Sequence, residues 1–376
     1  MRKLLTYALA TGMVLAGPGV AGAQNFDDPE EFARQMDQLS MEPMGPEGKP
    51  WEQYLVDQMG DTAQYASEGP HTICFSNAGV NNPWRVVGYT NMTEEVALHD
   101  EIGEFIHVDA EGSDDKQIAD IADLLASGDC DLLIVSPNTT AALTPAVEDA
   151  CEQLPVIVFD RGVQTDCPVT FIHPVGGYGF GIQGAQFIAD NVDEGANVLM
   201  LRILPGVDVL ETRYSAGRRI LDEAGLNVVG AEFTDGDNAN TKSIVEDYLQ
   251  RGSIDAVWMD AGATAVAAVE AFEDGGYDIP VFVGEDQQDF LQKWNDLDMT
   301  AIAPTYPSYQ WRTPIIAAVR VLSGEAVPAP EWVLPQPAIT QENLNSFIDP
   351  NMPPLHYAMC GCDEMDNYPQ AWGGVE

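Results

Sequence analysis

Three glycines, Gly179, Gly181 and Gly184, form a G-x-G-x-x-G motif, which could hold the pyrophosphate of a dinucleotide cofactor. In such sites an acidic residue lies about 20 residues further on, at the end of the next strand, where it binds a ribose hydroxyl. Here the next apolar segment, residues 197–204, ends without an acidic residue. We therefore interpret the glycines as small residues that let the chain pass between two domains and let a helix pack closely against a sheet. We expect no cofactor.

Other catalytic patterns are missing from the sequence. It contains no G-x-S-x-G motif, which would place a serine nucleophile, and no H-E-x-x-H motif, which would bind zinc. The five histidines show no spacing typical of metal ligands, and they are His71, His99, His107, His173 and His356. The sequence therefore predicts no catalytic residues, no metal and no enzymatic activity.

A second set of polar and aromatic residues follows the apolar segments that we interpret as strands. The set consists of Asn82, Trp84, Arg85, Ser136, Asp160, Arg161, Arg213, Asp260 and Asp286. An aromatic face packs on C–H groups, carboxylates accept hydrogen bonds from hydroxyls, and arginine offers a planar fork of donors. Each residue alone would pass for a turn former, a helix cap or a surface ion pair. Together they favour binding of a flat, hydroxyl-rich ligand.

The elements that must position these residues alternate along the chain from His71 onward. Short apolar segments, typical of buried strands, alternate with amphipathic helices in two successive series. The apolar segments are 71–77, 104–110, 130–137, 155–161, 197–204, 227–234, 255–260 and 280–286. Two such series predict two doubly wound α/β domains with parallel sheets, in which ligands bind beyond the carboxyl ends of the strands.

The sequence resembles the bacterial periplasmic sugar-binding proteins of the ribose-binding type over roughly residues 72–325. The matching stretches follow in the family's order, and they are NNPWR (81–85), VSPNTTAAL (135–143), PVIVFDR (155–161), ETRYSAG (211–217) and VGED (283–286). Trp84 and Arg85 are most similar to the galactofuranose-binding branch. The resemblance implies a type I periplasmic binding protein fold, with two lobes joined by a three-crossover hinge and the ligand clamped between them.

On this resemblance the chain divides into lobe 1, residues 71–174 plus 306–334, and lobe 2, residues 175–305 plus 335–350. Residues 24–70 form an acidic leader, with short helices expected at 27–38 and 51–59, and residues 351–376 form a C-terminal tail. The glycines after Val175 would mark the first crossover and act as a hinge. Thr305, at the last crossover, joins Arg213 and Asp286 on the wall of lobe 2. The family has a ring where this chain has Gly236, so that ring is either absent or supplied by Tyr306 or Trp258.

The resemblance implies the soluble component of an importer, which delivers a monosaccharide or related polyol to an ABC-type permease in the inner membrane. We expect it to act as a monomer. Two alternatives remain open. The same site could belong to a subunit that presents its ligand to a chemoreceptor or sensor kinase. An exported sugar-modifying enzyme would need a cofactor loop, which the glycine motif does not supply.

The charge of the chain excludes several classes of partner. The 376 residues carry 60 acidic and 16 basic side chains, which gives a formal net charge of −44. Nucleic acids and anionic membrane surfaces need basic patches, so neither is expected as a partner. The acidic residues are spread along the whole chain, which is typical of a solvated surface that tolerates high salt.

The N-terminus resembles a signal peptide. Arg2 and Lys3 precede an apolar stretch at 4–16, and Ala21 and Ala23 form an A-x-A-like cleavage site. We expect residues 1–23 to be removed after Ala23 and the mature protein to lie in the periplasm.

Six cysteines in an exported chain favour disulfides, and six allow 15 different pairings. Cys130 and Cys151 would lie near the same edge of one parallel sheet, so we favour that pair. Cys360 and Cys362 are expected to staple the C-terminal tail. Cys74, within an apolar segment, is expected to be a buried thiol.

Overall fold

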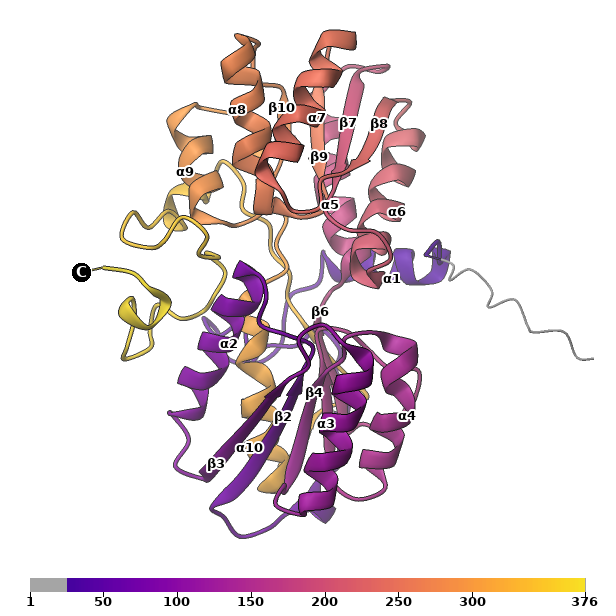
Figure 1. Ribbon diagram of the computed structural model, residues 1–376. Coiled ribbons are helices and arrows are strands. Elements are labelled where there is room, and N and C mark those ends of the chain that lie inside the picture. Colours follow the sequence, from indigo (N-terminus) through magenta and orange to yellow (C-terminus); the bar gives the residue numbers. More distant parts are fainter. Residues whose placement is uncertain (1–25, 376) are drawn as a thin grey trace, which may run out of the picture.

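A computed structural model describes residues 26–375, and it has two parallel sheets stacked end to end, each covered by helices on both faces (Figure 1). The predicted signal peptide, residues 1–23, lies outside the described residues. The expected fold class, two doubly wound α/β lobes joined by three crossovers, is confirmed. Within the described residues no helix is both long enough and apolar enough to cross a membrane.

The first sheet has six strands in the order β13-β6-β5-β4-β2-β3, and all neighbours are parallel. Its strands are β2 (His71–Asn77), β3 (Ile102–Asp109), β4 (Leu132–Ser136), β5 (Val156–Phe159), β6 (Thr170–Pro174) and β13 (Glu331–Leu334). The helices against it are α2 (Pro83–Val96), α3 (Asp114–Ser127), α4 (Thr140–Cys151) and α10 (Thr313–Leu322). Strands such as β4 and β5 are buried along their whole length, as expected for a sheet covered on both faces.

The second sheet has five parallel strands in the order β11-β10-β9-β7-β8. Its strands are β7 (Asn197–Arg202), β8 (Asn227–Phe233), β9 (Ala256–Met259), β10 (Val281–Val283) and β11 (Ala301–Ile302). Its helices are α5 (Gly177–Asn191), α6 (Asp208–Glu223), α7 (Asn238–Arg251), α8 (Ala265–Gly275) and α9 (Gln288–Asp296). Short 3₁₀ turns lie at 63–65, 262–264, 308–311, 344–346 and 370–372.

The chain passes between the two sheets three times. It leaves the first sheet after β6, returns to it after β11, and leaves again after β13. The third passage is tied to the second by an antiparallel bridge between Ala303 and Ile339. We keep the terms lobe 1 and lobe 2, with the boundaries expected from the sequence, as our proposed division of the chain.

The glycines of the G-x-G-x-x-G motif lie in α5 and let it pack closely on its neighbours. A Cβ atom on Gly181 would lie 2.2 Å from the backbone oxygen of Arg213 in α6. A Cβ on Gly184 would lie 2.8 Å from a side-chain carbon of Val283 in β10. Atoms of a neighbouring helix and strand occupy the space beside these glycines, so no room is left there for a phosphate group. Close packing, as we interpreted from the sequence, accounts for them.

The acidic leader packs against both lobes. Helix α1 (Pro29–Gln38) lies against α5, where the side chain of Gln35 accepts a hydrogen bond from the backbone of Gly179 at 2.9 Å. Trp51 is buried in the core of lobe 1, and β1 (Met59–Gly60) pairs with β12 (Val327–Pro328). The helix expected at 51–59 is wrong, because this stretch begins in a turn and its backbone then bonds Met44 of the leader and Val333 and Ala329 of lobe 1.

The disulfides join Cys74 to Cys130, Cys151 to Cys167, and Cys360 to Cys362. The predicted Cys130–Cys151 pair is wrong, and Cys74 is buried but not a free thiol. Cys130 follows α3, which packs on β2, whereas Cys151 ends α4, which packs on β5, so the two cysteines reach different neighbours. Cys360 and Cys362, expected to staple the tail, bond to each other, so the disulfide closes a small ring within the tail.

Candidate functional site

A cleft of about 440 Å³ lies between the two sheets, at the carboxyl ends of their strands. Both lobes and the C-terminal tail contribute to its walls. The lining residues are Asn81, Asn82, Pro83, Trp84, Arg85, Asp160, Arg161, Ile203, Leu204, Val207, Val209, Leu210, Arg213, Asp235, Gly236, Ala261, Ala263, Glu285, Tyr306 and Tyr357. This is the position at which open α/β sheets bind ligands.

Helix α2 positions the first group of side chains. Asn82 caps this helix, since its side-chain oxygen accepts a hydrogen bond from the backbone of Arg85 at 2.9 Å. Pro83 at the first helical position suits the same helix start. The cap directs Trp84 and Arg85 toward the cleft.

Arg85 and Asp160 form a buried ion pair on the wall of lobe 1. A guanidinium nitrogen of Arg85 donates to Asp160 Oδ2 at 2.7 Å, and a second nitrogen donates to Asn77 Oδ1 at 3.1 Å. Burial lowers the pKa of Arg85 to about 10, although Asp160 acts in the opposite direction. Ser136 lies behind the pair, with its hydroxyl 3.4 Å from Asp160 Oδ2. The wall therefore presents fixed donors and acceptors rather than mobile side chains.

Asp160 follows β5 in the left-handed backbone region, with φ of 68°. This conformation turns the chain, so that Asp160 faces Arg85 while Arg161 turns to donate to the backbone oxygen of Asn138 at 2.5 Å. The backbone oxygen of Asp160 accepts a hydrogen bond from the hydroxyl of Tyr306 at 3.0 Å. Tyr306 lies on the second passage between the lobes.

Trp84 supplies the aromatic surface of lobe 1. Its indole nitrogen donates to the backbone oxygen of Tyr306 at 2.8 Å, and its ring packs against the rings of Tyr306 and Trp311, with centroids 5.7 and 5.6 Å away. These contacts hold the ring in one orientation. The ring can therefore present a rigid apolar face to a ligand.

Arg213, near the start of α6, is the central side chain of the lobe 2 wall. Its guanidinium donates to the backbone oxygen of Asp260 at 2.6 Å and lies 3.5 Å from Glu285 Oε1. It also lies over the ring of Phe180, 4.0 Å from the centroid. Glu285 is fixed in turn by the backbone N–H of Gly262, which donates to its other oxygen at 2.9 Å. Arg213 Nε is buried and has no hydrogen-bond partner among the described residues.

The structure brings six of the ten predicted residues to the cleft and places four behind it. The six that line the cleft are Asn82, Trp84, Arg85, Asp160, Arg161 and Arg213. The four behind it are Ser136, Asp260, Asp286 and Thr305, all fully buried.

Each of three buried residues on lobe 2 holds a different part of the wall. Asp260 accepts a hydrogen bond from the backbone of Ile203 at 2.8 Å, which anchors the loop before α6. Thr305 donates to the backbone oxygen of Pro337 at 2.6 Å and so joins two passages between the lobes. Asp286 accepts from the backbone of Met359 in the tail at 2.7 Å. Burial raises the pKa of both Asp260 and Asp286 to about 7.

Sequence reasoning missed several lining residues. Glu285 and Tyr306 are the direct neighbours of predicted residues, so strand ends pointed to the right place but not to the right side chain. Of the two rings considered for lobe 2, Tyr306 lines the cleft whereas Trp258 is buried in the core. Tyr357 had no signal in the sequence, because it lies in the tail. Aliphatic side chains of residues 203–210, which form the loop before α6 and its first turn, also line the cleft.

One group of side chains outside the cleft has the composition of a metal site. His356, Cys360 and Cys362 are buried, and their ligand atoms lie within 4.8 Å of one another. However, the two cysteines are joined in a disulfide, so neither has a thiolate to offer. The group is therefore a structural cluster in this oxidised form.

The fold and the cleft define a two-lobed α/β protein that can enclose a small ligand between its halves. Residues 73–326 match the family model described as periplasmic binding protein domain. The chain belongs to this family.

A relative with curated function supports the same grouping. The chain is 30% identical over 258 residues to the ribose import binding protein RbsB of Bacillus subtilis (strain 168), which covers 68% of this chain and 83% of the relative.

Solved structures share the fold. An ABC transporter solute binding protein from Thermobispora bispora DSM 43833 matches with a TM-score of 0.67 at 21% identity, over 81% of this chain and 98% of that one. Another from Bacillus halodurans C-125, with bound myo-inositol, matches with a TM-score of 0.66 at 22% identity, over 75% of this chain and 98% of that one.

Proposed function

We propose that the protein captures a monosaccharide or related polyol between its lobes and delivers it to an ABC-type permease in the inner membrane. Its action is binding and release, without catalysis. One observation carries the proposal. The interlobe cleft has a buried arginine–carboxylate pair on each wall, Arg85 with Asp160 and Arg213 with Glu285, beside the ring of Trp84. The name of the Bacillus subtilis relative and the myo-inositol in the Bacillus halodurans structure support a sugar-like ligand.

The chemistry of the walls suits such a ligand. Hydroxyl groups both donate and accept, so they can bridge an arginine N–H and a carboxylate oxygen on the same wall. The C–H face of a sugar ring can pack on Trp84, while the aliphatic side chains of residues 203–210 cover its opposite side. In this arrangement the six predicted residues that line the cleft contact the ligand. Behind them, Ser136 and Asp260 bond members of this set, Thr305 joins two passages between the lobes, and Asp286 holds the tail.

Transport follows from contacts to both lobes. A ligand that touches both walls stabilises the closed arrangement by its differential affinity for that state, and the permease then recognises the closed form. We propose that the three passages near residues 175, 304 and 335 act as the hinge, that the mature protein is a periplasmic monomer, and that residues 1–23 are its export signal.

A thermal-shift screen of the purified mature protein tests this function. The panel contains pentoses, hexoses, furanoses and polyols, with amino acids, nucleosides and dinucleotides as controls. A ligand that binds only the folded state raises the melting temperature by mass action. We expect a shift with one sugar or polyol, confirmed by calorimetry. A shift with an amino acid, nucleoside or dinucleotide and with no sugar or polyol would refute the proposal.

A further inference from the structure

The C-terminal tail supplies a side chain to the cleft although it lies beyond residues 73–326, which match the family model. Tyr357 lines the cleft, and its hydroxyl oxygen lies 3.4 Å from Glu285 Oε2 on the lobe 2 wall. Its ring belongs to the same buried apolar cluster as Val87 of α2, which Trp84 packs against. Tyr357 therefore lies where the two walls of the cleft meet.

Lobe 2 holds the tail by its backbone. Tyr357 forms an antiparallel bridge with Gln287, directly before α9. The next residue, Ala358, donates to the backbone oxygen of Asp286 at 2.8 Å, and Met359 donates to its carboxylate at 2.7 Å. These bonds fix the position of Tyr357 against Glu285. They also explain why Asp286, expected at the cleft, points away from it.

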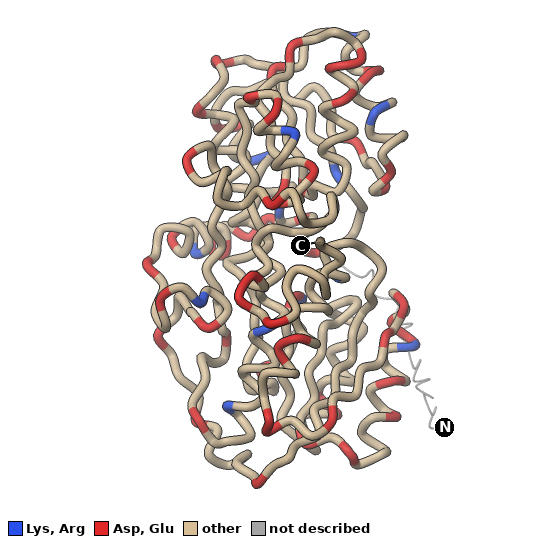
Figure 2. Tube along the Cα trace, turned by 90° about the vertical axis from the view of Figure 1, so that its left-hand side faces the viewer, with Lys and Arg blue, Asp and Glu red and all other residues tan. Residues whose placement is uncertain are grey.

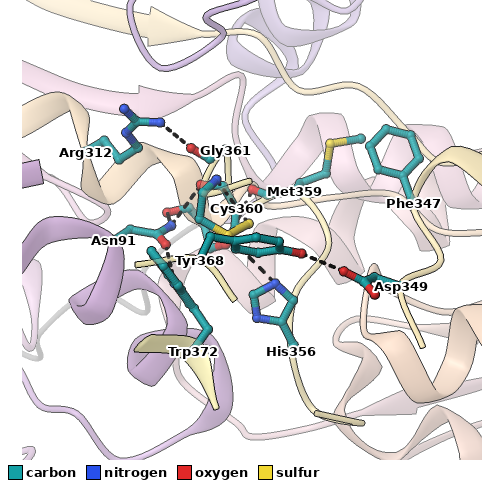
Figure 3. Close-up of a disulfide and its surroundings, with 12 residues drawn as sticks. Asn91, Arg312, Phe347, Asp349, His356, Met359, Cys360, Gly361, Tyr368 and Trp372 are labelled. Atoms are coloured by element: carbon teal, nitrogen blue, oxygen red, sulfur yellow. Dashed lines mark hydrogen bonds between the residues drawn. A yellow bond between two sulfur atoms is a disulfide. The ribbon is translucent and has the colours of Figure 1, made fainter. Parts of the chain in front are cut away.

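Lobe 1 holds the same segment a few residues further on, as Figure 3 shows. Asn91 of α2 donates to the backbone oxygen of Cys360 at 2.9 Å and accepts from the indole of Trp372 at 2.8 Å. Arg312, just before α10, donates to the backbone oxygen of Gly361. In Figure 1 this segment runs between α9 and α2, and so spans the two lobes at one side of the cleft.

The Cys360–Cys362 disulfide closes the turn that carries the lobe 1 contacts. The two carbonyl groups that bind Asn91 and Arg312 belong to Cys360 and Gly361, inside the small ring that the bond closes. Gly361 has φ of 59°, and a Cβ there would lie 2.4 Å from the ring of Trp51. The turn is therefore tightly packed, and the disulfide restricts the backbone that presents these carbonyls.

We propose that residues 354–372, here called the strap, complete the ligand-binding cleft. Tyr357 is a ligand-contacting residue that the strap delivers, and the Cys360–Cys362 disulfide keeps the strap docked on both lobes. The hydroxyl of Tyr357 donates to Glu285, which leaves its oxygen free to accept a hydrogen bond from a ligand hydroxyl. The ligand contact rests on the proposed function, whereas the docking of the strap does not.

Substitution of Tyr357 tests the ligand contact, with calorimetry on the sugar or polyol that the thermal-shift screen identifies. We expect Tyr357→Ala to weaken binding by at least about tenfold, since ring and hydroxyl are both lost. Tyr357→Phe keeps the ring and should weaken binding by about threefold to tenfold. The matched control is Tyr277→Phe, because Tyr277 is an exposed residue of lobe 2 that belongs neither to the strap nor to the lining of the cleft, and its affinity should equal that of the wild type. Wild-type affinity in both Tyr357 variants would overturn the contact.

Hydrogen exchange tests the docking of the strap without any ligand. The double variant Cys360→Ser, Cys362→Ser removes one disulfide and leaves the other two intact. We expect amides at 356–362 to exchange at least about tenfold faster than in the wild type, because local opening exposes them. Trp372→Phe, which keeps a ring but loses the bond to Asn91, is a milder second variant, and it should speed exchange in the same segment. Unchanged exchange in both variants would overturn the proposal that the disulfide keeps the strap docked on the lobes.

The two measurements separate this inference from the proposed function. If the wild type binds none of the sugars or polyols, the proposed function and the ligand contact both fail. The exchange experiment still tests whether the disulfide keeps the strap docked. If the wild type binds a sugar and the Tyr357 variants bind equally well, only the ligand contact fails. Faster exchange in the cysteine variant, with weaker binding in Tyr357→Ala, supports both parts.

Discussion

At the scale of single residues, the cleft depends on a buried ion pair whose two members come from distant parts of the chain. Asp160 is held in the left-handed region with φ of 68°, where an aspartate or asparagine is tolerated better than most residues. It neutralises Arg85, which has only 3% of its surface exposed. The local turn and the long-range pair thus depend on the same residue.

Asp160→Asn removes the negative charge of Asp160 while keeping its backbone conformation. Asparagine keeps the turn, but Arg85 is left as an uncompensated buried charge, so the free energy of unfolding should fall by about 3–5 kcal/mol. Denaturant titration measures this loss. Asp298→Asn is the matched control, because Asp298 also has positive φ, 48°, but is exposed, and it should leave the stability unchanged. Equal stability of Asp160→Asn and the wild type would show that the charge of Asp160 is not needed to compensate Arg85.

Trp84→Ala should weaken ligand binding by about 2–4 kcal/mol, because it removes both apolar burial and the packing of a ring on the ligand. Calorimetry on the ligand found by the screen measures the change. Trp84→Phe keeps a ring of smaller area and loses the hydrogen bond to Tyr306, so it should bind with intermediate affinity. The site assignment is wrong if Trp84→Ala binds as tightly as the wild type.

At the scale of elements, the packing of α5 on α6 positions Arg213. Gly181 has no room for a side chain, since a Cβ would meet the backbone oxygen of Arg213 at 2.2 Å. A backbone atom cannot rotate away as a flexible side chain can. The two helices would have to separate, and Arg213 would move with α6.

Gly181→Ala should therefore destabilise the protein by about 1–3 kcal/mol, as overpacking of a close contact does. It should also weaken ligand binding, because Arg213 moves away from the cleft. Unfolding by denaturant and calorimetry check the two effects. Gly252→Ala is the control, since Gly252 has extended φ of 171° and nothing within 4 Å of its Cβ position, and it should match the wild type in both. Wild-type stability in Gly181→Ala would contradict the packing argument.

Asp286, three residues after β10, carries a buried carboxyl group whose ionisation opposes folding. Burial raises the pKa of Asp286 to about 7, and the neighbouring Glu285 acts in the same direction. The other titratable groups that face it are Arg213, Tyr309 and Tyr357. In the unfolded chain the carboxyl has a pKa of about 4. Because the folded value is the higher one, this group's contribution to stability is lost as the pH rises from about 4 to about 7.

Asp286→Asn removes this ionisation and keeps an oxygen that can accept from Met359. The free energy of unfolding of the variant, relative to that of the wild type, should therefore rise between pH 4 and pH 7 by up to about 4 kcal/mol. Denaturant unfolding across this pH range gives the difference. Asp278→Asn, at an exposed carboxylate, should show a difference from the wild type that does not change with pH. A pH-independent difference for Asp286→Asn as well would rule out the linkage.

At these two scales the sequence predicted positions better than orientations. Alternating apolar segments and helices were enough for two parallel sheets, because strands buried on both faces are apolar throughout. Six of the ten residues expected at strand ends also line the cleft. However, Glu285 faces the cleft and Asp286 faces the tail, although both follow the same short strand. The turn after β10 decides between them, and no periodicity extends into a turn.

At the scale of the whole molecule, the two lobes are joined by more than the three passages. The leader contacts lobe 2 through α1 and lobe 1 through Trp51, while the strap contacts both lobes at the other end of the chain. Neither segment has the strand–helix alternation, and Tyr357 lies about 70 residues after its partner Glu285. Sequence reasoning expected a helix at 27–38 and a cysteine staple in the tail, but it missed the contacts of both segments with the lobes, because these contacts are long-range and depend on the finished fold.

The net charge of −44 sets the response of the whole molecule to salt. Figure 2 shows acidic residues along the trace of both lobes, with few basic residues between them. The mutual repulsion of these carboxylates disfavours the compact state. Salt screens this repulsion once the Debye length is shorter than the spacing of the charges. The Debye length falls from about 10 Å at 0.1 M salt to about 3 Å at 1 M salt. The melting temperature without ligand should therefore rise with NaCl, most steeply at low concentration, and equally with KCl if screening is the cause. A melting temperature that stays constant or falls would mean that the carboxylates are already far enough apart in water for repulsion to be negligible.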